Sequence, residues 1–487
     1  MTRPVSRATS LAFFLTAIFV TILISTDQYI SSVIPNSLWA KFGMITFPYK
    51  ITAVVLIAIS ITSIIFHLLL KAPDAYILLI ISTLIALQTN GIKLGGIDLI
   101  ALMPFIVILF VFAESLRLPN FQIVLPGVMF FGLLLILLDI PYITANHIYP
   151  PGRFIINFLS LAKGVLVAFI FVNLIRSERY LAIAIQAFLI VAFISALIGI
   201  GQIALVYFMG ITINFASEAA EWKPNFLGLT LRATGLTTWP SWLADFSVLA
   251  LPIMLFRCFN ATSLLWRTIY LIGLLVLLSA IFLTLTYAAW FGAVLIFAAF
   301  PFLYWPQKSL HFIMGLLLIG ALLQITGGID WAYEHGLKKI TTSTGMVERK
   351  VYLLSTLNEI IRDPWIGSGI YAEENFSENS YRKRAHNTGL QAWAALGLPG
   401  LLVFVTMMLV MLTQLGLMSM SSRGTDRQLF QALTLGILVM ILEMFAEPNL
   451  TAPVTWFYLG LCQAAILVYC TERYPRPLSR VVADSGK

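Results

Sequence analysis

Charged side chains are scarce in this sequence. Asp, Glu, Lys and Arg together make up 11% of its 487 residues, whereas hydrophobic side chains make up 60%. A soluble globular domain carries roughly 25% charged residues, because its surface has to be covered with polar groups. The composition therefore excludes a soluble protein and predicts a protein that lies within a membrane.

Cysteine and clustered metal ligands are almost absent as well. The three cysteines, Cys258, Cys462 and Cys470, all fall at the ends of apolar runs or inside them, so no disulfide framework follows from their spacing. No Asp-x-Asp pair or closely spaced group of histidines indicates a metal site. The sequence also shows no internal repeat and no matched pair of broken helices, which disfavours a transporter built from repeats.

Long apolar runs make up most of the chain. About fourteen of them could each form a helix of roughly 20 residues that crosses the bilayer. We place them near residues 8–26, 51–70, 74–90, 97–115, 121–141, 154–176, 181–208, 241–257, 268–285, 286–305, 309–327, 386–415, 428–446 and 453–471. The first run lacks a small-residue cleavage site, so we expect a membrane span there and no cleavable signal peptide. The predicted fold is an all-α, polytopic integral membrane protein.

Basic residues are distributed unevenly between the two sides of this arrangement. With the N-terminus inside, fifteen lie in cytoplasmic ends and loops, and only four lie in short outer loops: Lys41, Lys50, Lys93 and Arg153. Short cytoplasmic loops are enriched in Lys and Arg, so we expect both termini in the cytoplasm. This bias accounts for the net charge of +8 without a nucleic-acid partner.

Two long polar segments on the outer side interrupt the apolar runs, at residues 209–240 and 328–385. Long loops on a rigid scaffold often carry function. We divide the chain into N-terminal transmembrane helices at 1–208, a transmembrane region with the first long loop at 209–327, the second long loop at 328–385, and C-terminal transmembrane helices at 386–487.

The second long loop contains a helical pattern in "MVERKVYLLSTLNEIIRDPW". Its apolar residues recur at helical spacing: Val347, Val351, Leu354, Leu357 and Ile361. This spacing predicts an amphipathic helix that lies at the membrane interface and stops at Asp363 and Pro364. The following "GSG" predicts a turn.

Four carboxylates and one lysine fall within the expected spans. Asp98, Asp139, Asp245 and Glu443 lie near the outer ends of their helices, where each could snorkel to the interface or line a polar cavity that opens outward. Lys163 lies deeper, about 14 Å along its helix at 1.5 Å per residue. A lysine at that depth is expected to have a partner or to meet a lipid phosphate.

The stretch "RKRAHNTGLQAWAALGLPGLLVF" sets cations, His386 and Asn387 directly against an apolar run. Charge at the edge of a membrane helix is costly, so the stretch is a candidate functional site. Alternatively, His386 could cap the helix, and Arg382, Lys383 and Arg384 could attract lipid headgroups. Gly397 and Gly400 are expected to permit close helix packing.

Three segments share an order and spacing that resemble a known family. They are "LRATGLTTWPSWLADFSVLALP" from Leu231, "MVERKVYLLSTLNEIIRDPWIGSGI" from Met346 and "HNTGLQAWAALGLPGLLVF" from His386. Over roughly residues 228–415 the chain resembles the O-antigen ligase and polymerase superfamily of bacterial envelope glycosyltransferases. The resemblance implies a GT-C-like, inverting, metal-independent transferase without a cofactor, which acts on the periplasmic face of the inner membrane.

The resemblance also implies the substrates and partners. The donor would be a glycan linked to undecaprenyl pyrophosphate, and the acceptor would be a sugar hydroxyl on a second lipid-linked glycan or on lipid A core. Membrane lipids and a chain-length regulator protein are further expected partners, and nucleic acid is not.

By the same resemblance, Arg232 and Arg349 would bind the donor pyrophosphate, and His386 would act as the base or the orienting group for the acceptor hydroxyl. The chemistry suits these residue types, because guanidinium matches phosphate oxygens and imidazole accepts protons near neutral pH. We further expect five residues in the substrate site: Asn387, Arg384, Lys163, Asp245 and Tyr287. Tyr287, in "TYAAW", stands where the family usually has a second phosphate-binding arginine.

Polymerisation of lipid-linked repeat units is the preferred activity. About fourteen spans and the missing second arginine fit the ligase pattern less well. Ligation of a finished glycan to lipid A core is the close alternative, and a lipid-linked glycan flippase is the rival from another class. A flippase would place polar residues through both leaflets, whereas here only Lys163 lies deep.

Overall fold

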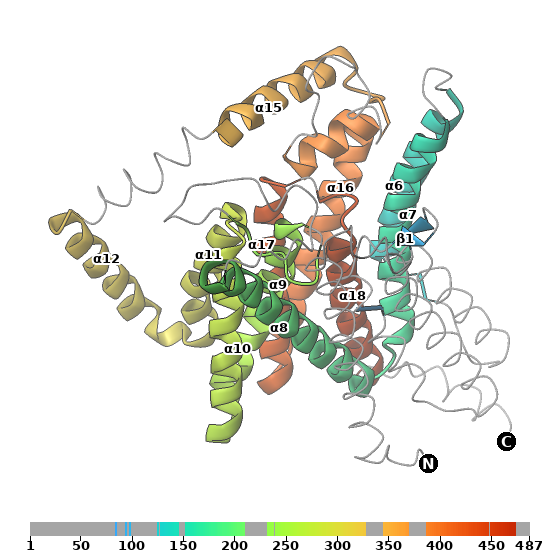
Figure 1. Ribbon diagram of the computed structural model, residues 1–487. Coiled ribbons are helices and arrows are strands. Elements are labelled where there is room, and N and C mark those ends of the chain that lie inside the picture. The colour runs from blue at the N-terminus through green and yellow to red at the C-terminus, as the bar shows by residue number, and fades with distance from the viewer. Residues whose placement is uncertain are drawn as a thin grey trace, which may run out of the picture. The chain divides into compact units, whose positions relative to one another are not determined.

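The structure is a computed structural model in which the described part of the chain is almost entirely helical (Figure 1). It describes residues 83–84, 93–94, 97–98, 124–125, 127–145, 151–209, 231–237, 239–327, 344–369, 386–447 and 449–473. The long helices and one 3₁₀ turn are α6 (Gly127–Ala145), α7 (Pro151–Leu174), α8 (Glu178–Met209), α9 (Pro240–Asn260), α10 (Leu264–Leu283), α11 (Tyr287–Tyr304), η2 (Pro306–Lys308), α12 (Ser309–Ile325), α15 (Thr344–Arg362), α16 (Thr388–Ser421), α17 (Gly424–Met444) and α18 (Pro453–Arg473).

Seven of these helices are long and apolar enough to cross a membrane, namely α8, α9, α10, α11, α16, α17 and α18. The described parts of α6 and α7 form two shorter apolar helices. Every expected span from residue 121 onward coincides with a helix, with ends that differ by a few residues. The spans expected at 8–26 and 51–70 lie outside the described residues. A polytopic, predominantly helical membrane protein is therefore confirmed, and the number fourteen stays a prediction.

Strand structure among the described residues is limited to one short hairpin. Strands β1 (Lys93–Leu94) and β2 (Ile97–Asp98) pair antiparallel, with Lys93 opposite Asp98. The prediction that a helix begins at residue 97 is wrong by at least these two residues.

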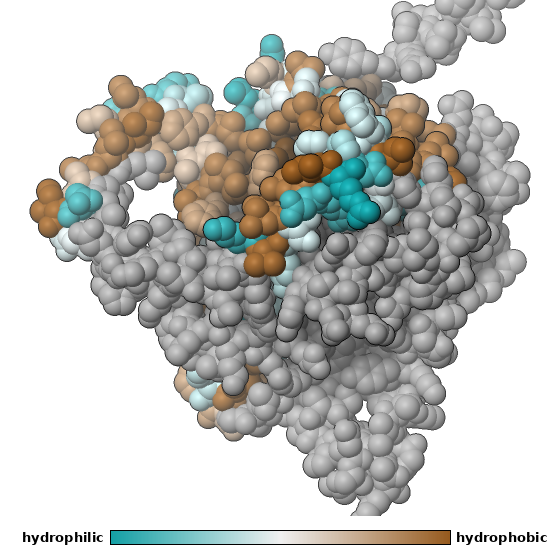
Figure 2. Space-filling view, turned by 90° about the horizontal axis from the view of Figure 1, so that it is seen from above, coloured by the Kyte–Doolittle hydropathy of each residue, from teal (hydrophilic) through white to brown (hydrophobic). Residues whose placement is uncertain are grey.

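Apolar side chains cover much of the described surface in Figure 2. Leu264 and Leu275 on α10 are 80% and 57% exposed, and Leu317 on α12 is 63% exposed. An apolar surface of this extent is disfavoured in water and suits contact with lipid.

The chain forms two compact units. One comprises the described residues within 1–126, 163–289 and 456–487, and the other those within 127–162 and 290–455. In the first unit, Phe457 of α18 lies at the centre of an aromatic cluster. Its ring centroid is 4.7 Å from that of Phe171 on α7 and 5.1 Å from that of Phe188 on α8. Gly460 lets α18 approach α7 closely, because a Cβ there would lie 2.8 Å from the Cα of Ala168.

Helix α9 is largely buried within this first unit, where it packs against α8 and α10. It begins at Pro240, a residue that suits the first helical position because its missing N–H would have no partner there. Helices α10 and α11 are separated by only three residues, as the sequence indicated. In that break, Leu285 is buried with a positive φ of 51°, a conformation that side chains other than glycine rarely adopt.

In the second unit, the turn that follows α15 docks onto a kink in α16 (Figure 1). The kink is at Gly397, whose φ is 69°, and Pro399 follows it. Three backbone hydrogen bonds join the two segments: Ser368 N to Ala394 O at 2.9 Å, Gly369 N to Ala395 O at 2.7 Å, and Leu398 N to Pro364 O at 2.9 Å. A Cβ on Gly397 would overlap the carbonyl of Trp365. Gly397 thus permits close packing, as expected. Its neighbour is the turn after α15 and not another helix.

Helix α15 confirms the amphipathic helix expected in the second long loop, and it ends at Arg362 as Pro364 predicted. It packs on α16 and turns Tyr352, Thr356 and Ile360 inward, each 4% exposed or less. Its apolar stripe points away from the protein, with Val351 53% and Ile361 76% exposed. Contact of this stripe with the membrane interface stays a prediction.

The carboxylates expected near the outer ends of their spans are enclosed by protein. Asp139, Asp245 and Glu443 are at most 2% exposed. A carboxylate that snorkels would lie at the surface, so this alternative is wrong for these three residues.

Candidate functional site

The segment that carries Arg232 is held in place by polar side chains of α8. Gln202 accepts hydrogen bonds from the backbone N–H groups of Thr234 at 3.1 Å and Gly235 at 3.0 Å, and it donates to the Gly235 carbonyl at 3.0 Å. Ser195 Oγ accepts from Leu236 N at 3.1 Å. Because Gln202 is buried and satisfied by the loop, it specifies one loop conformation.

Glycine is required within this loop. Gly235 has a φ of 61°, and a Cβ there would lie 2.5 Å from the Ser195 carbonyl oxygen. On either side of Arg232, Leu231 and Ala233 are buried with Ile203 and Leu243. In an extended segment successive side chains point to opposite sides, so burial of these neighbours directs Arg232 away from the apolar cluster.

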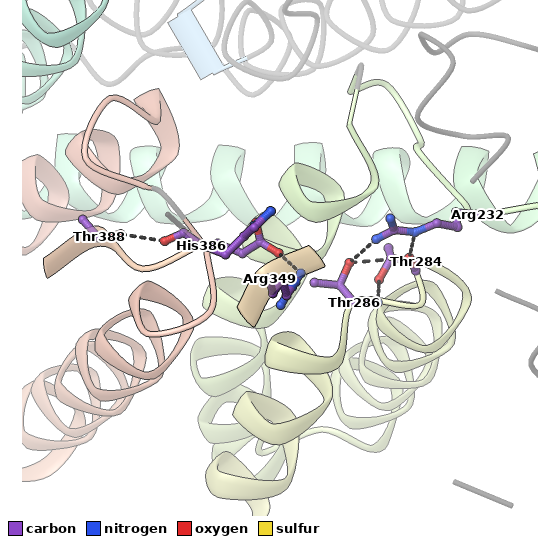
Figure 3. A network of polar contacts seen from close by, with 7 residues as sticks. Arg232, Thr284, Thr286, Arg349, His386 and Thr388 are labelled. Atoms are coloured by element: carbon purple, nitrogen blue, oxygen red, sulfur yellow. Dashed lines mark hydrogen bonds and ion pairs between the residues drawn. The ribbon is translucent and has the colours of Figure 1, made fainter. Parts of the chain in front are cut away.

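The guanidinium of Arg232 binds the break between α10 and α11. Its Nε donates to the Thr284 carbonyl at 2.7 Å, and its Nη2 donates to Thr286 Oγ1 at 3.0 Å (Figure 3). The two acceptors belong to the residues on either side of Leu285, the residue with the positive φ. Two directed hydrogen bonds fix the plane of a guanidinium, which is the arrangement that a phosphate-binding arginine needs.

Three other predicted site residues lie in the same unit. Tyr287 is half-buried as the first residue of α11, directly after Thr286. Lys163 is half-buried on α7, and Asp245 is buried on α9. The fold therefore places Tyr287 next to the contacts of Arg232, where the family resemblance implies the second arginine.

Arg349 and His386 meet at one carboxylate, that of Glu447, which follows α17 (Figure 3). Arg349 Nη2 lies 3.2 Å from Glu447 Oε1, and His386 Nδ1 lies 3.6 Å from Glu447 Oε2. The ring of Tyr352, from the inward face of α15, lies 6.1 Å from the His386 ring. Two residues that sequence reasoning assigned to catalysis thus share a partner that it had not identified.

The start of α16 is capped by Asn387, not by His386. Asn387 Oδ1 accepts a hydrogen bond from Leu390 N at 2.9 Å, which is the usual N-cap geometry. The alternative interpretation that His386 caps the helix is therefore wrong. Asn387 was predicted to bind substrate, and its amide oxygen serves this cap. Arg384, together with Arg382 and Lys383, lies outside the described residues.

Two buried polar atoms in the Arg349 and His386 cluster have no hydrogen-bond partner among the described residues. These are His386 Nδ1 and the hydroxyl of Tyr352. Buried polar groups are nearly always satisfied, and an exception needs an explanation such as a binding role. The cluster thus combines a cation, a carboxylate and two unsatisfied polar atoms, a set that can bind a phosphate and a sugar hydroxyl.

Sequence reasoning missed the residues that hold the predicted ones in place. Gln202 and Ser195 could have been noticed as polar residues inside an apolar span, because such residues are rare unless they have a role. Glu447 stands in "AEPN", an acidic residue in a short loop between two expected spans, which by itself is common. No local signal identifies Thr284, since its contribution is a backbone carbonyl.

The described helices define a polytopic membrane protein. Residues 272–405 match the model of a family described as O-antigen ligase. The match confirms the resemblance to the O-antigen ligase and polymerase superfamily, whose members are membrane glycosyltransferase-like enzymes. The matched region contains Tyr287, Arg349, His386 and the kink of α16, whereas Arg232 and Glu447 lie outside it. A search of curated protein sequences found no match.

Proposed function

We propose that the chain is an inverting glycosyltransferase that polymerises oligosaccharide repeat units linked to undecaprenyl pyrophosphate. His386 accepts the proton of the acceptor hydroxyl, and the resulting oxygen attacks the anomeric carbon of the donor sugar. The bond between that carbon and the pyrophosphate breaks on the opposite face, and Arg232 and Arg349 stabilise the charge of the leaving pyrophosphate. The reaction takes place on the periplasmic face of the inner membrane.

The observation that carries this proposal is the meeting of Arg349 and His386 at Glu447. Arg349 lies on α15 and His386 directly before α16, and both fall within the region that matches the O-antigen ligase family. Anion binding and proton transfer are the two tasks that glycosyl transfer from a pyrophosphate requires. A carboxylate beside an imidazole also suits its use as a base.

Arg232 supports the proposal from a separate cluster. Its guanidinium is oriented by Thr284 and Thr286, and the loop beneath it is held by Gln202. Because arginine side chains are proposed to bind the pyrophosphate, turnover should survive an excess of chelator.

Polymerisation is preferred to ligation because Tyr287 stands where the family pattern usually has a second arginine, and because about fourteen expected spans also fit the ligase pattern less well. With Tyr287 in that position, Arg349 carries more of the phosphate charge. Ligation to lipid A core remains the second candidate, since the matching family is described as O-antigen ligase.

The test uses purified enzyme in lipid nanodiscs and a defined lipid-linked repeat unit as donor. A ladder of products with increasing numbers of repeats is expected when the repeat unit is also the acceptor. His386→Ala should reduce turnover by about 10² to 10⁴-fold, the usual contribution of a general base, with donor binding nearly unchanged. Wild-type turnover in a folded His386→Ala enzyme would refute the proposed role of this histidine. Transfer to lipid A core alone would assign ligation instead.

A further inference from the structure

Among the described residues, a nitrogen donor lies near each of the two carboxylate oxygens of Glu447. Oε1 lies 3.2 Å from the Arg349 guanidinium, and Oε2 lies 3.6 Å from the His386 imidazole. A carboxylate has lone pairs for both donors, but in the position that gives Arg349 a contact of 3.2 Å its other oxygen is too far from His386 Nδ1 for a hydrogen bond. The two contacts are therefore in competition.

The backbone of Glu447 is fixed from both sides. Thr388 Oγ1 donates to the Glu447 carbonyl at 2.7 Å, and Asn449 N donates to Thr388 Oγ1 at 2.8 Å. Glu447 N donates to the Glu443 carbonyl at 2.9 Å. Because Thr388 is fully buried, these bonds hold the carboxylate in reach of Arg349 and His386 and leave only its side-chain torsions to adjust.

The contact with His386 is incomplete. A separation of 3.6 Å exceeds the roughly 3.2 Å limit of a good hydrogen bond, and His386 Nδ1 is buried without a hydrogen bond among the described residues. A shift of the carboxylate by about half an ångström would close this gap. The partner that opposes the shift, Arg349, has a side chain 37% exposed, so a ligand can reach it.

We propose that Glu447 couples donor binding to activation of His386. This inference rests on the proposed function. Without donor, Arg349 holds the carboxylate. When the donor pyrophosphate binds Arg349, it takes over the ion pair, and Glu447 turns to accept a hydrogen bond from His386 Nδ1–H. Donor binding thereby prepares the base, which limits proton abstraction to the enzyme that has a donor to react with.

The proton balance of this step is complete. Nδ1–H donates to Glu447, which leaves Nε2 as the nitrogen that takes the proton of the acceptor hydroxyl. The new carbon–oxygen bond forms as the carbon–pyrophosphate bond breaks, and undecaprenyl pyrophosphate leaves with the bonding electrons. The imidazolium, stabilised by Glu447, then gives its proton to water.

The coupling is tested with Glu447→Gln, which keeps the size of the side chain and removes its charge. Farnesyl pyrophosphate serves as the binding probe in calorimetry, and turnover is measured with the lipid-linked donor. Two opposite changes are expected. Pyrophosphate should bind about fivefold tighter, the ratio that corresponds to loss of a competing, partly exposed ion pair. Turnover at saturating donor should fall by about 10²-fold, because the base loses its orienting partner.

The Arg349→Ala background isolates the competition. In that background Glu447→Gln should leave pyrophosphate affinity unchanged. Glu447 and the pyrophosphate compete for the Arg349 side chain, and this side chain is absent. Glu359→Gln is the matched control: its carboxylate also lies on the second unit and accepts from Ser368 Oγ at 2.9 Å. In Glu359→Gln, pyrophosphate affinity and turnover should both stay at the wild-type values.

Weaker or unchanged pyrophosphate binding in Glu447→Gln, or wild-type turnover, would overturn the coupling. If Glu447→Gln does not fold, Glu447→Asp replaces it. The shorter carboxylate can no longer reach both partners, so turnover should fall at least tenfold, and wild-type turnover in Glu447→Asp would contradict the proposal. The proposed function fails by a different result, namely wild-type turnover in His386→Ala and Arg349→Ala.

Discussion

The chemistry proposed for this protein rests on single residues, and each of them depends on a few directed contacts. Arg232 is oriented by Thr284 O and Thr286 Oγ1, and Arg349 and His386 are joined through Glu447. Functional groups that are held by such contacts lose little freedom when they bind a ligand. The identity of the side chain therefore matters as much as its charge.

Arg232→Lys is expected to fail although it keeps the positive charge. An ammonium cannot keep the contacts with Thr284 and Thr286 and bind phosphate through a planar fork at the same time. The ratio kcat/KM for the lipid-linked donor should fall by about 10 to 100-fold, the size of a lost charge-assisted hydrogen bond. Steady-state kinetics with a defined donor measures it.

Arg257→Lys is the control for this substitution, since Arg257 donates to Gln186 at an exposed position on the same unit. Its kinetics should match those of the wild type. Equal kinetics for Arg232→Lys and Arg257→Lys would remove Arg232 from the donor site.

At the scale of elements, the contact between α15 and α16 positions the second cluster. The turn after α15 docks into the kink of α16 through backbone hydrogen bonds, and Trp393 Nε1 donates to the Pro364 carbonyl at 3.0 Å. Arg349 lies on one of these helices, and His386 directly precedes the other. The family motifs "DPWIGSG" and "LGLPG" are thus two halves of one structural joint.

Gly397→Ala should break this joint. The residue has a φ of 69°, and a Cβ would overlap the Trp365 carbonyl, so we expect a loss of about 2 kcal/mol or more in stability. Turnover should fall together with the stability, because Arg349 and His386 would no longer be held next to each other at Glu447. Thermal unfolding in detergent and turnover are the two measurements.

Gly416→Ala lies on the same helix, and a Cβ there meets nothing within 4 Å. It should be neutral or stabilise the helix by up to about 1 kcal/mol. A Gly397→Ala variant as stable as Gly416→Ala would show that the joint tolerates a side chain at the kink.

At the scale of the whole molecule, the proposed chemistry requires α15 to lie outside the cytoplasm. Asn358 on α15 and Arg427 on α17 are both exposed, and the charge distribution predicts that they lie on opposite sides of the membrane. In a variant with Cys258, Cys462 and Cys470 replaced by alanine, a cysteine at Asn358 should react with an impermeant thiol reagent in intact spheroplasts.

A cysteine at Arg427 should react only after lysis in the same assay. The reverse labelling pattern would show that the topology is the opposite of the predicted one, with the proposed donor site on the cytoplasmic side.

The sequence by itself determined the properties that are local. Apolar runs predicted the helices from residue 121 onward, and Pro364 predicted the end of α15, because hydropathy, periodicity and proline act within one segment. The superfamily, together with Arg349 and His386 as candidates, followed from motifs of about twenty residues, and the family match confirms the superfamily.

Only the tertiary structure decided which residues support those candidates. Glu447 is 98 residues from Arg349, Thr284 is 52 residues from Arg232, and Gly235 is 33 residues from Gln202. It also decided that α15 turns Tyr352 and Thr356 inward and its apolar stripe outward. Contacts of this kind depend on how distant helices pack against one another. The hydrophobic periodicity of one helix does not identify the helix that it packs against.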